Sequence, residues 1–225
     1  MLRIMALVCA AFVGMSVVTS LASAQFYAEG RVGVAILSTA SSQVLVPGPL
    51  RLPAIQEFGV GATGGVAVGY GFDSGVRTEF NIQVQGNDFE MLRVLGYIEP
   101  NTGEAISVTP MFDLLYDIRI GESPFVPFVG VGVGLLYTTV SPANALIFQI
   151  DDDATSFAWE VVGGLAWEFS DRFAATANYR YLGTAGTQEF RILVPGPQVL
   201  SLLTELSSHN ITFGLRYTFT RGGGS

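Results

Sequence analysis

The sequence predicts an all-β protein, an eight-stranded antiparallel up-and-down barrel that crosses a membrane. Three observations support this fold class. The chain of 225 residues is 49% hydrophobic and only 13% charged, whereas about a quarter of the residues in a typical soluble domain are charged. In its body, every apolar run is interrupted by glycine or polar residues before it reaches the length of a membrane helix. Apolar and small or polar residues alternate instead, which is typical of a strand with two unlike faces.

The N-terminus predicts a secretory signal peptide. Arg3 precedes an apolar centre, and Ala22 and Ala24 form an A-x-A site, so we expect cleavage after Ala24. The only cysteine, Cys9, lies inside this signal, which leaves the mature chain without a thiol for disulfide or metal chemistry. We therefore expect three parts: a signal peptide at 1–24, an outer-membrane β-barrel at 25–219 and a flexible tail at 220–225.

The alternation predicts eight strands joined by connections of alternating length. The strands are expected at about 26–38, 58–72, 76–86, 105–118, 125–139, 156–169, 173–184 and 208–219. Short turns are expected at 73–75, 119–124 and 170–172, and long loops at 39–57, 87–104, 140–155 and 185–207. Short turns at one end and long loops at the other are typical of outer-membrane barrels, whose turns face the periplasm. An even strand count then places both termini in the periplasm.

Two all-β architectures fit this alternation, and the volume of each face distinguishes them. A soluble barrel buries its apolar face inside, whereas a membrane barrel turns that face toward lipid. Here the apolar face is bulky on nearly all strands and exceeds what an eight-stranded interior can hold. We therefore expect Gly130, Gly132 and Gly134, which alternate with bulky residues, to face a narrow lumen. Their missing side chains would leave room for long neighbours such as Arg180 or Glu160.

Aromatic residues of the apolar face gather near the strand ends, as expected for girdles at the two membrane interfaces. The turn-end girdle is expected to contain Phe26, Phe72, Tyr116, Phe125, Trp167, Phe169, Phe173, Tyr217 and Phe219. The loop-end girdle is expected to contain Tyr137, Phe157, Trp159 and Tyr181.

The last strand, TFGLRYTF at 212–219, carries the most specific motif. It resembles the insertion signal that the outer-membrane assembly machinery reads, through Thr212, Gly214, Leu215, Tyr217 and Phe219. With PFVPFVGVGVGLLY (124–137) and NYRYLGTAG (178–186), the chain resembles the small eight-stranded outer-membrane barrels of Gram-negative bacteria, the opacity-protein and OmpA-type porin-like surface antigens. That family usually ends on the aromatic residue, whereas TRGGGS follows here. The resemblance implies a place among outer-membrane lipid and lipopolysaccharide, with the barrel-assembly machinery as a partner during insertion.

The inward face is expected to carry six carboxylates and four guanidiniums: Glu29, Arg31, Arg77, Glu79, Asp113, Asp117, Glu160, Glu168, Arg180 and Arg216. Buried charges are tolerated when they are paired and hydrogen-bonded. We therefore expect a salt-bridge network that plugs the lumen and specifies the register of the strands. The alternative is a narrow, gated diffusion channel with a weak cation preference that follows from the excess of carboxylates.

Few motifs could carry other chemistry. Residues 59–64 match the G-x-G-x-x-G fingerprint, but strand alternation continues where a helix would be needed. Asp151–Asp153 lacks the ligand spacing of a calcium loop, so no metal or cofactor is expected. The acidic chain, with a formal charge of −8, is a poor candidate for nucleic-acid binding. Ser207 and His209 have the residue types of a lipid A-modifying enzyme, but they lie about 6–7 Å apart on a strand. With only Glu205 as an orienting acid, a structural histidine and no enzymatic activity are expected.

Two predicted loops share the sequence LVPGP, at 45–49 and 193–197. Two interpretations remain open: the turns pack on each other above the barrel, or they form an exposed apolar patch that binds a partner. The sequence thus predicts a non-enzymatic barrel of porin-like or surface-antigen type for envelope structure or surface contact. A small channel, a lipid A-modifying enzyme and an adhesin remain the alternatives.

Overall fold

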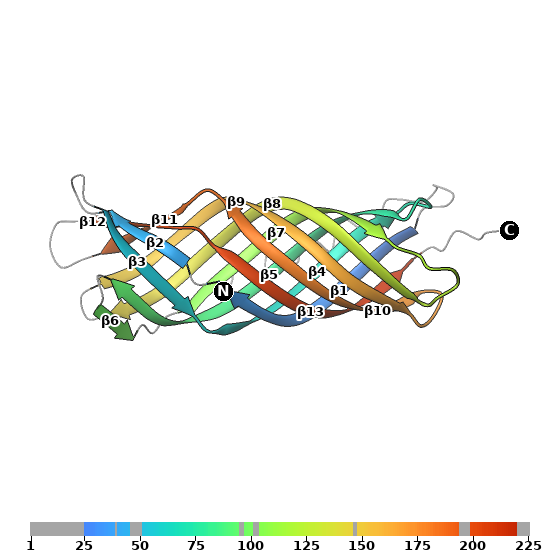
Figure 1. Ribbon diagram of the computed structural model, residues 1–225, viewed down its shortest axis with the longest axis horizontal. Helices are drawn as coiled ribbons and strands as arrows, with labels where there is room; N and C mark the ends of the chain where they lie inside the picture. The colour runs from blue at the N-terminus through green and yellow to red at the C-terminus, as the bar shows by residue number, and fades with distance from the viewer. Residues whose placement is uncertain are drawn as a thin grey trace.

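The computed structural model describes residues 25–38, 40–45, 51–94, 97–100, 104–145, 148–193 and 199–219. These residues form one antiparallel sheet of 13 strands, wrapped into an elongated barrel (Figure 1). The strands are β1 (Gln25–Leu37), β2 (Ala40–Leu45), β3 (Arg51–Phe58), β4 (Val60–Gly71), β5 (Val76–Val94), β6 (Tyr97–Pro100), β7 (Glu104–Asp117), β8 (Phe125–Ala145), β9 (Phe148–Glu168), β10 (Phe173–Ala185), β11 (Gln188–Leu193), β12 (Val199–Thr204) and β13 (Ser207–Thr218). Within these described ranges, no helix has the length and apolarity needed to cross a membrane.

Eight of the strands form the closed barrel predicted from the sequence. Strands β1, β4, β5, β7, β8, β9, β10 and β13 each pair with the next in this order, and β13 pairs with β1. This is up-and-down topology, so the predicted fold class is confirmed. The predicted signal peptide at 1–24 and tail at 220–225 lie outside the described residues.

The long connections contain more regular structure than the sequence predicts. β5, β8 and β9 run to 19, 21 and 21 residues, and the five short strands β2, β3, β6, β11 and β12 continue the sheet beyond the barrel proper. In this part the order is β6-β5-β3-β2-β12-β11-β9-β8. Where an extended segment continues beyond the barrel, it lies beside the unpaired edge of a neighbouring strand. Pairing between the two satisfies the backbone N–H and C=O groups of both. Such pairing needs no alternation of side chains, and for this reason the sequence pattern missed it.

The first and fourth long connections lie side by side, because β2 pairs with β12 and places Leu45 opposite Ser201. This brings the strand that leads into the first LVPGP segment next to the strand that follows the second. Most of each segment lies outside the described residues, so the choice between mutual packing and an exposed patch stays open.

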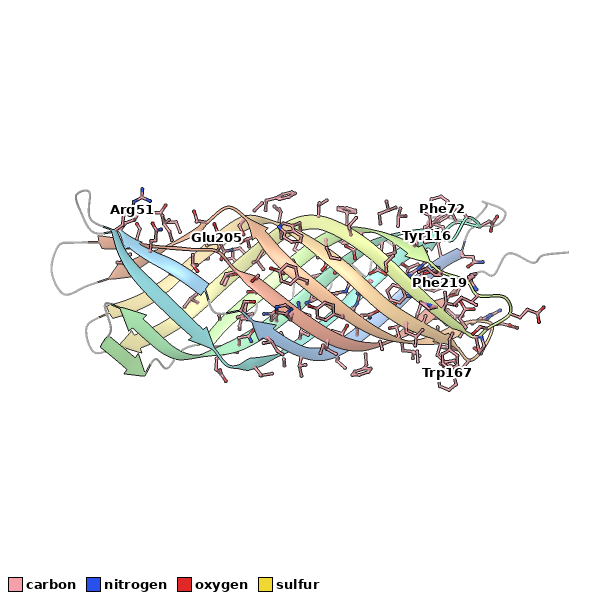
Figure 2. The ribbon with its side chains drawn as sticks, in the orientation of Figure 1. Arg51, Phe72, Tyr116, Trp167, Glu205 and Phe219 are labelled. Atoms are coloured by element: carbon pink, nitrogen blue, oxygen red, sulfur yellow. The ribbon has the colours of Figure 1, made fainter. Side chains whose placement is uncertain are left out.

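Side-chain exposure follows the inverted pattern of a membrane barrel. On β8, Val129, Val131 and Val133 are 51%, 56% and 51% exposed, whereas Gly132 between them is buried. Side chains project outward along the whole barrel wall (Figure 2). The bulky face therefore meets lipid and the small or polar face meets the lumen.

The outward aromatic side chains at the turn end contact one another in sequence around the barrel. One run joins Phe26, Tyr70 and Phe72, and another joins Phe125, Trp167, Phe169, Phe173, Tyr217 and Phe219. Phe72, Tyr116, Trp167 and Phe219 mark this end in Figure 2. We call these residues, with Tyr116, the turn-end ring.

The turn between β4 and β5 needs Gly75, whose φ of 85° suits glycine.

Candidate functional site: a charged cluster that fills the lumen

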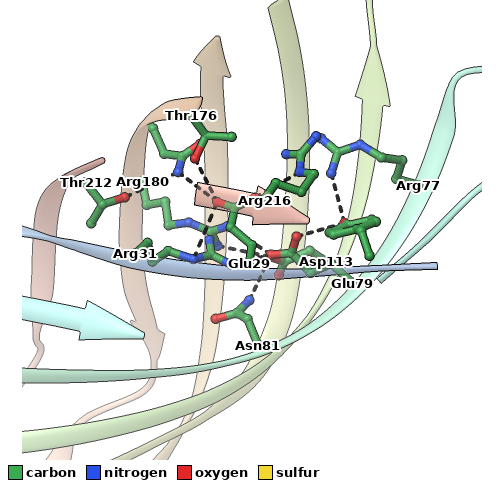
Figure 3. Close-up of polar contacts among 12 residues, drawn as sticks. Glu29, Arg31, Arg77, Glu79, Asn81, Asp113, Thr176, Arg180, Thr212 and Arg216 are labelled. Carbon is green, nitrogen blue, oxygen red and sulfur yellow. Dashed lines mark hydrogen bonds and ion pairs between the residues drawn. The ribbon is translucent and has the colours of Figure 1, made fainter. Parts of the chain in front are cut away.

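Inward-facing charges contact one another inside the barrel (Figure 3). The nine that are buried, with exposures of 1% to 8%, are Glu29, Arg31, Arg77, Glu79, Asp113, Asp117, Glu160, Arg180 and Arg216. They come from six strands, β1, β5, β7, β9, β10 and β13. We call these nine residues the lumen cluster. It contains five carboxylates and four guanidiniums.

Arg180 of β10 is the centre of the lumen cluster. Its Nη1 lies 3.0 Å from Asp113 Oδ2 of β7 and also donates to Glu160 Oε1 of β9. Its Nη2 lies 3.3 Å from Glu79 Oε1 of β5. Glu79 also accepts from Arg31 Nη2 of β1. One guanidinium thus crosses the lumen to three carboxylates on three strands, which ties opposite walls of the barrel together.

Glu29 of β1 forms a second centre on the β13 side of the lumen. Its Oε2 accepts from Arg216 Nε at 3.0 Å, and its Oε1 accepts from Thr176 Oγ1 at 3.0 Å. Asn178 Nδ2 donates to the same Oε1 at 3.4 Å, and Arg31 Nε lies 4.0 Å away. Arg31 therefore links the Glu29 and Arg180 centres into one network.

Arg77 of β5 binds Asp117 of β7 through Nε, at 2.9 and 3.0 Å from the two carboxylate oxygens. Its Nη1 donates to Tyr27 Oη at 2.8 Å, and Tyr27 Oη donates to Glu79 Oε2 at 2.8 Å. The guanidinium carbons of Arg77 and Arg216 lie 5.3 and 4.9 Å from the centre of the Tyr27 ring. They lie 5.1 and 5.8 Å from the centre of the Phe128 ring, within the range of cation–π attraction.

Tyr27 and Phe128 are members of this site that sequence reasoning missed. The available signal was their position: Tyr27 lies two residues before Glu29, and Phe128 two residues before Gly130. Alternation therefore turns both inward, although aromatic residues in this sequence mostly face lipid.

Gly132 makes room for the lumen cluster. It lies opposite Asp113 on the β7 side and opposite Glu160 on the β9 side. A Cβ at this position would collide with the Asp113 carboxylate and press on Glu160 Cγ. Gly132 therefore leaves space for neighbouring carboxylates, as expected for Glu160, whereas Gly130 and Gly134 leave space for Leu115 and Met111.

Apolar side chains flank the lumen cluster along one wall. Met111, Leu136, Ala158, Leu182 and Leu206 form a buried group on its loop side. Leu115, Val126, Phe128, Val162 and Ala166 form another on the turn side of Asp113 and Glu160. Asp113 and Glu160 each have an apolar inward neighbour two residues away in both directions, whereas Asp117 is followed two residues later by the charged Arg119. The two apolar groups therefore limit access of water to Asp113 and Glu160 along this wall.

Glu168 differs from the nine members of the lumen cluster. It ends β9 at the turn-end mouth, where Oε1 lies 3.0 Å from Arg119 Nη2. The side chains of Glu168 and Arg119 are 27% and 49% exposed. Both line a vestibule of about 250 Å³ that also reaches Arg77 and Arg216. The expected lumen position of Glu168 is therefore corrected to the rim, because water reaches the last residue of the strand.

Ser207 and His209 both face outward on β13, away from the lumen. His209 Nδ1 shares a hydrogen bond of 2.7 Å with Tyr179 Oη of β10. Within the described part of the chain no contact joins Ser207 to His209. The histidine is thus held by a tyrosine on the neighbouring strand.

The residues of the C-terminal motif divide between the two faces of β13. Thr212 is buried and accepts from Asn178 Nδ2 at 3.4 Å, and Gly214 lies opposite Arg31. Leu215 is 51% exposed on the outer wall. Tyr217 and Phe219 belong to the turn-end ring, with their ring centres 5.0 Å apart.

Comparison with known proteins agrees with this geometry. Residues 5–219 match the sequence profile of the family described as "Outer membrane protein beta-barrel domain". A protein named "Outer membrane protein" from Gluconacetobacter diazotrophicus is 27% identical over an alignment of 183 residues, with coverage of 71% of this chain and 47% of that relative. The match thus spans about half of that relative's length. An uncharacterized protein of Brucella abortus is 24% identical over 197 residues, covering 71% of this chain and 69% of its own length.

Two solved structures share the fold. OprG of Pseudomonas aeruginosa aligns with a TM-score of 0.61 and 16% identity, covering 87% of this chain and 96% of its own. Neisserial surface protein A aligns with a TM-score of 0.53 and 17% identity, covering 86% and 97%. At these identities the likeness concerns the barrel alone.

Proposed function

This chain belongs to the outer membrane protein beta-barrel family, and on that premise we propose that it is a non-enzymatic envelope protein with a closed lumen and a surface-contact role. The observation that carries the proposal is the position of Arg180, bound to Glu79, Asp113 and Glu160 from three other strands. An eight-stranded barrel has an interior just wide enough for side chains. Buried ion pairs that span this interior block solute passage.

The extended strands support a role in surface contact. About 9–11 residues suffice for a tilted strand to cross a membrane, whereas β8 and β9 each contain 21. The excess length carries the loop ends away from the bilayer on a paired, stiff sheet. We infer that these ends face the outside and that both termini face the periplasm, because the loops of such barrels are extracellular.

The orientation of His209 supports a non-enzymatic role. A Ser–His nucleophile pair needs its members within hydrogen-bond reach, but His209 Nδ1 is engaged by Tyr179. Both residues face outward on β13, so their side chains lie on the outer wall of the barrel rather than in its lumen.

A narrow, weakly cation-preferring channel is the second candidate. One observation favours it: five carboxylates face four guanidiniums in the lumen cluster, which leaves one excess negative charge when all are ionised. Such a charge attracts cations if the lumen becomes hydrated. This candidate requires the Arg180 contacts to open.

Single-channel conductance in a planar bilayer separates these two functions. Folded mature chain (25–225), verified by a heat-dependent gel shift, is inserted as wild type, Arg180→Ala and Arg119→Ala. We expect no current steps from the wild type or from Arg119→Ala, the variant at the rim, and reproducible current steps from Arg180→Ala. Reproducible wild-type steps that change with Glu160→Gln would favour the channel. A silent Arg180→Ala barrel that is still folded would contradict the role of Arg180 as the plug.

A further inference from the structure

The vestibule at the turn end of the lumen contains two buried arginines in its lining. It has a volume of about 250 Å³ and is bounded by inward side chains of the barrel and by the turns at 73–75 and 170–172. Arg77 of β5 and Arg216 of β13 line it and are 4% and 8% exposed. We call these two residues the arginine pair. Pockets for drug-sized ligands measure about 300–1,000 Å³, so the vestibule suits a smaller molecule.

The two guanidiniums of the arginine pair lie close together. The Cζ atoms of both lie within 5.8 Å of the centres of the same two rings, those of Tyr27 and Phe128. Figure 3 shows the two groups next to each other. Like charges repel more strongly where little water separates them. An anion that contacts both guanidiniums would therefore stabilise their approach.

Most of the hydrogen-bond donors at the ends of the arginine pair are unused. Arg216 donates through Nε to Glu29, and neither of its Nη groups has a hydrogen-bond partner among the described residues. Arg77 Nη1 donates to Tyr27, whereas Arg77 Nη2 is buried and has no partner in the same part of the chain. Three of the four Nη groups thus lack an acceptor. Buried donors left in this way are costly, which makes them ready to bind a ligand.

The carboxylates that line the vestibule are engaged elsewhere or lie at its rim. Asp117 accepts from Arg77 Nε, and Glu168 accepts from Arg119. Asp73 and Asp171 belong to the turns and are exposed. Water and salt screen exposed charges, whereas the arginine pair is buried. The field at the inner end of the vestibule is therefore set mainly by the guanidiniums.

The chemistry of the arginine pair suits a phosphate group. Guanidiniums bind phosphate oxygens through paired N–H donors. A phosphate offers an oxygen to each of three Nη groups, whereas a carboxylate has only two oxygens. Ser170 adds a hydroxyl to the lining. Its Oγ accepts from the backbone N–H groups of Arg172 and Phe173, so its own proton is free to be donated to an anion.

We propose that the vestibule binds a small phosphate group, held by the Nη groups of Arg77 and Arg216. Free phosphate and the headgroup of a lipid share this chemistry, and the experiment below distinguishes them. The inference goes beyond the closed lumen proposed above, because it gives the turn end of the barrel a ligand site of its own. In the orientation proposed above the ligand is periplasmic, but binding to the purified barrel does not depend on that orientation.

Isothermal titration calorimetry of the folded mature chain (25–225) in phosphatidylcholine nanodiscs tests the site, because both ends of the barrel are accessible there. Inorganic phosphate is titrated at constant ionic strength, with acetate and chloride as matched titrants. Thr218→Glu and Thr218→Gln form a pair of nearly equal size and different charge. Thr218 lines the vestibule two residues beyond Arg216 on the same face of β13, and its replacement leaves the lumen cluster intact. A gel shift verifies barrel closure in every sample.

We expect one phosphate to bind per barrel, and acetate and chloride to bind at least about tenfold more weakly. Thr218→Glu should weaken phosphate binding at least about tenfold, because its carboxylate lies beside the bound anion. Thr218→Gln should stay within about twofold of the wild type. Arg216→Gln should also weaken binding at least about tenfold, as expected for lost hydrogen bonds from a charged donor. Arg119→Gln, at the rim, should change it less than about threefold.

Several results would overturn the site. Folded wild type that gives no saturable heat with phosphate would show that the donors of the arginine pair bind only water. Equal weakening by Thr218→Glu and Thr218→Gln would show that the effect is steric, and an equally large effect of Arg119→Gln would show a diffuse field in place of a site. Acetate binding as tight as that of phosphate would replace phosphate by a carboxylate. If Arg216→Gln does not close, the two Thr218 variants decide.

Nanodiscs that contain phosphatidic acid distinguish the two sources of the phosphate group. If the apparent affinity for inorganic phosphate falls at least about tenfold in them, the lipid headgroup competes for the vestibule and is the ligand. If the affinity is unchanged, the ligand is a soluble phosphate.

Discussion

Gly132 and Glu160 face each other across the β8–β9 ladder, and the glutamate side chain occupies the space that the glycine leaves open. On the other side of Gly132, the Asp113 carboxylate uses the same space. Two acidic side chains can thus approach one arginine because the strand between them carries no side chain. The cost of a glycine within a strand is offset by the ion pairs that it permits.

Gly132→Ala should destabilise the barrel by about 1–3 kcal/mol, because its Cβ has to displace Asp113 and Glu160 from their contacts. Gly30→Ala on β1 is the matched control, since nothing lies within 4 Å of a Cβ at that position. Equilibrium unfolding in urea, followed by tryptophan fluorescence, gives both free energies. Equal losses of unfolding free energy in the two variants would mean that Gly132 is not needed to make space for Asp113 and Glu160.

Arg180→Met should lower the free energy of unfolding by about 3–5 kcal/mol, because it leaves three buried carboxylates without their common partner. Arg119→Met removes an exposed ion pair with Glu168 and should cost less than about 1 kcal/mol. The same urea titration measures both variants. If the two losses are similar, the lumen cluster contributes no more to stability than a surface pair.

Cysteine labelling in intact cells tests the orientation of the barrel. Glu205→Cys at the loop end and Asp73→Cys at the turn end are both exposed positions. Removal of Cys9 with the predicted signal leaves no other thiol. A membrane-impermeant maleimide should label the Glu205 variant and leave the Asp73 variant unlabelled until the cells are opened. The reverse result would place the termini outside.

Tyr217→Ala should reduce the amount of folded barrel in the outer membrane several-fold, because Tyr217 belongs to the predicted assembly signal and packs against Phe173. Phe213→Ala is the control, since Phe213 lies on the same face of β13 but outside that signal and is 63% exposed. The heat-shifted fraction of the protein in isolated outer membranes measures both. Similar amounts of folded barrel for the two variants would mean that Tyr217 is not part of the assembly signal.

The positions of the eight barrel strands could be predicted because their cause is local. Lipid on one side of the wall and a crowded lumen on the other impose a two-residue period on every strand. Val129, Gly130 and Val131 display that period without reference to any other segment. The same local pattern turned nine of the ten expected charges inward to buried positions. Glu168 was misplaced because alternation does not say where the lumen opens to water.

The sequence by itself therefore determined the fold class, the inverted polarity of the barrel and the residue types that face the lumen. Only the tertiary structure decided which charges meet. Arg180 binds residues 20, 67 and 101 positions away in the chain, and no local pattern encodes these distances. They depend on the tilt and stagger of all eight strands and on the register in which β13 closes against β1. The short strands beyond the barrel also arise from pairing between distant segments, since a backbone hydrogen bond leaves no mark on side-chain pattern.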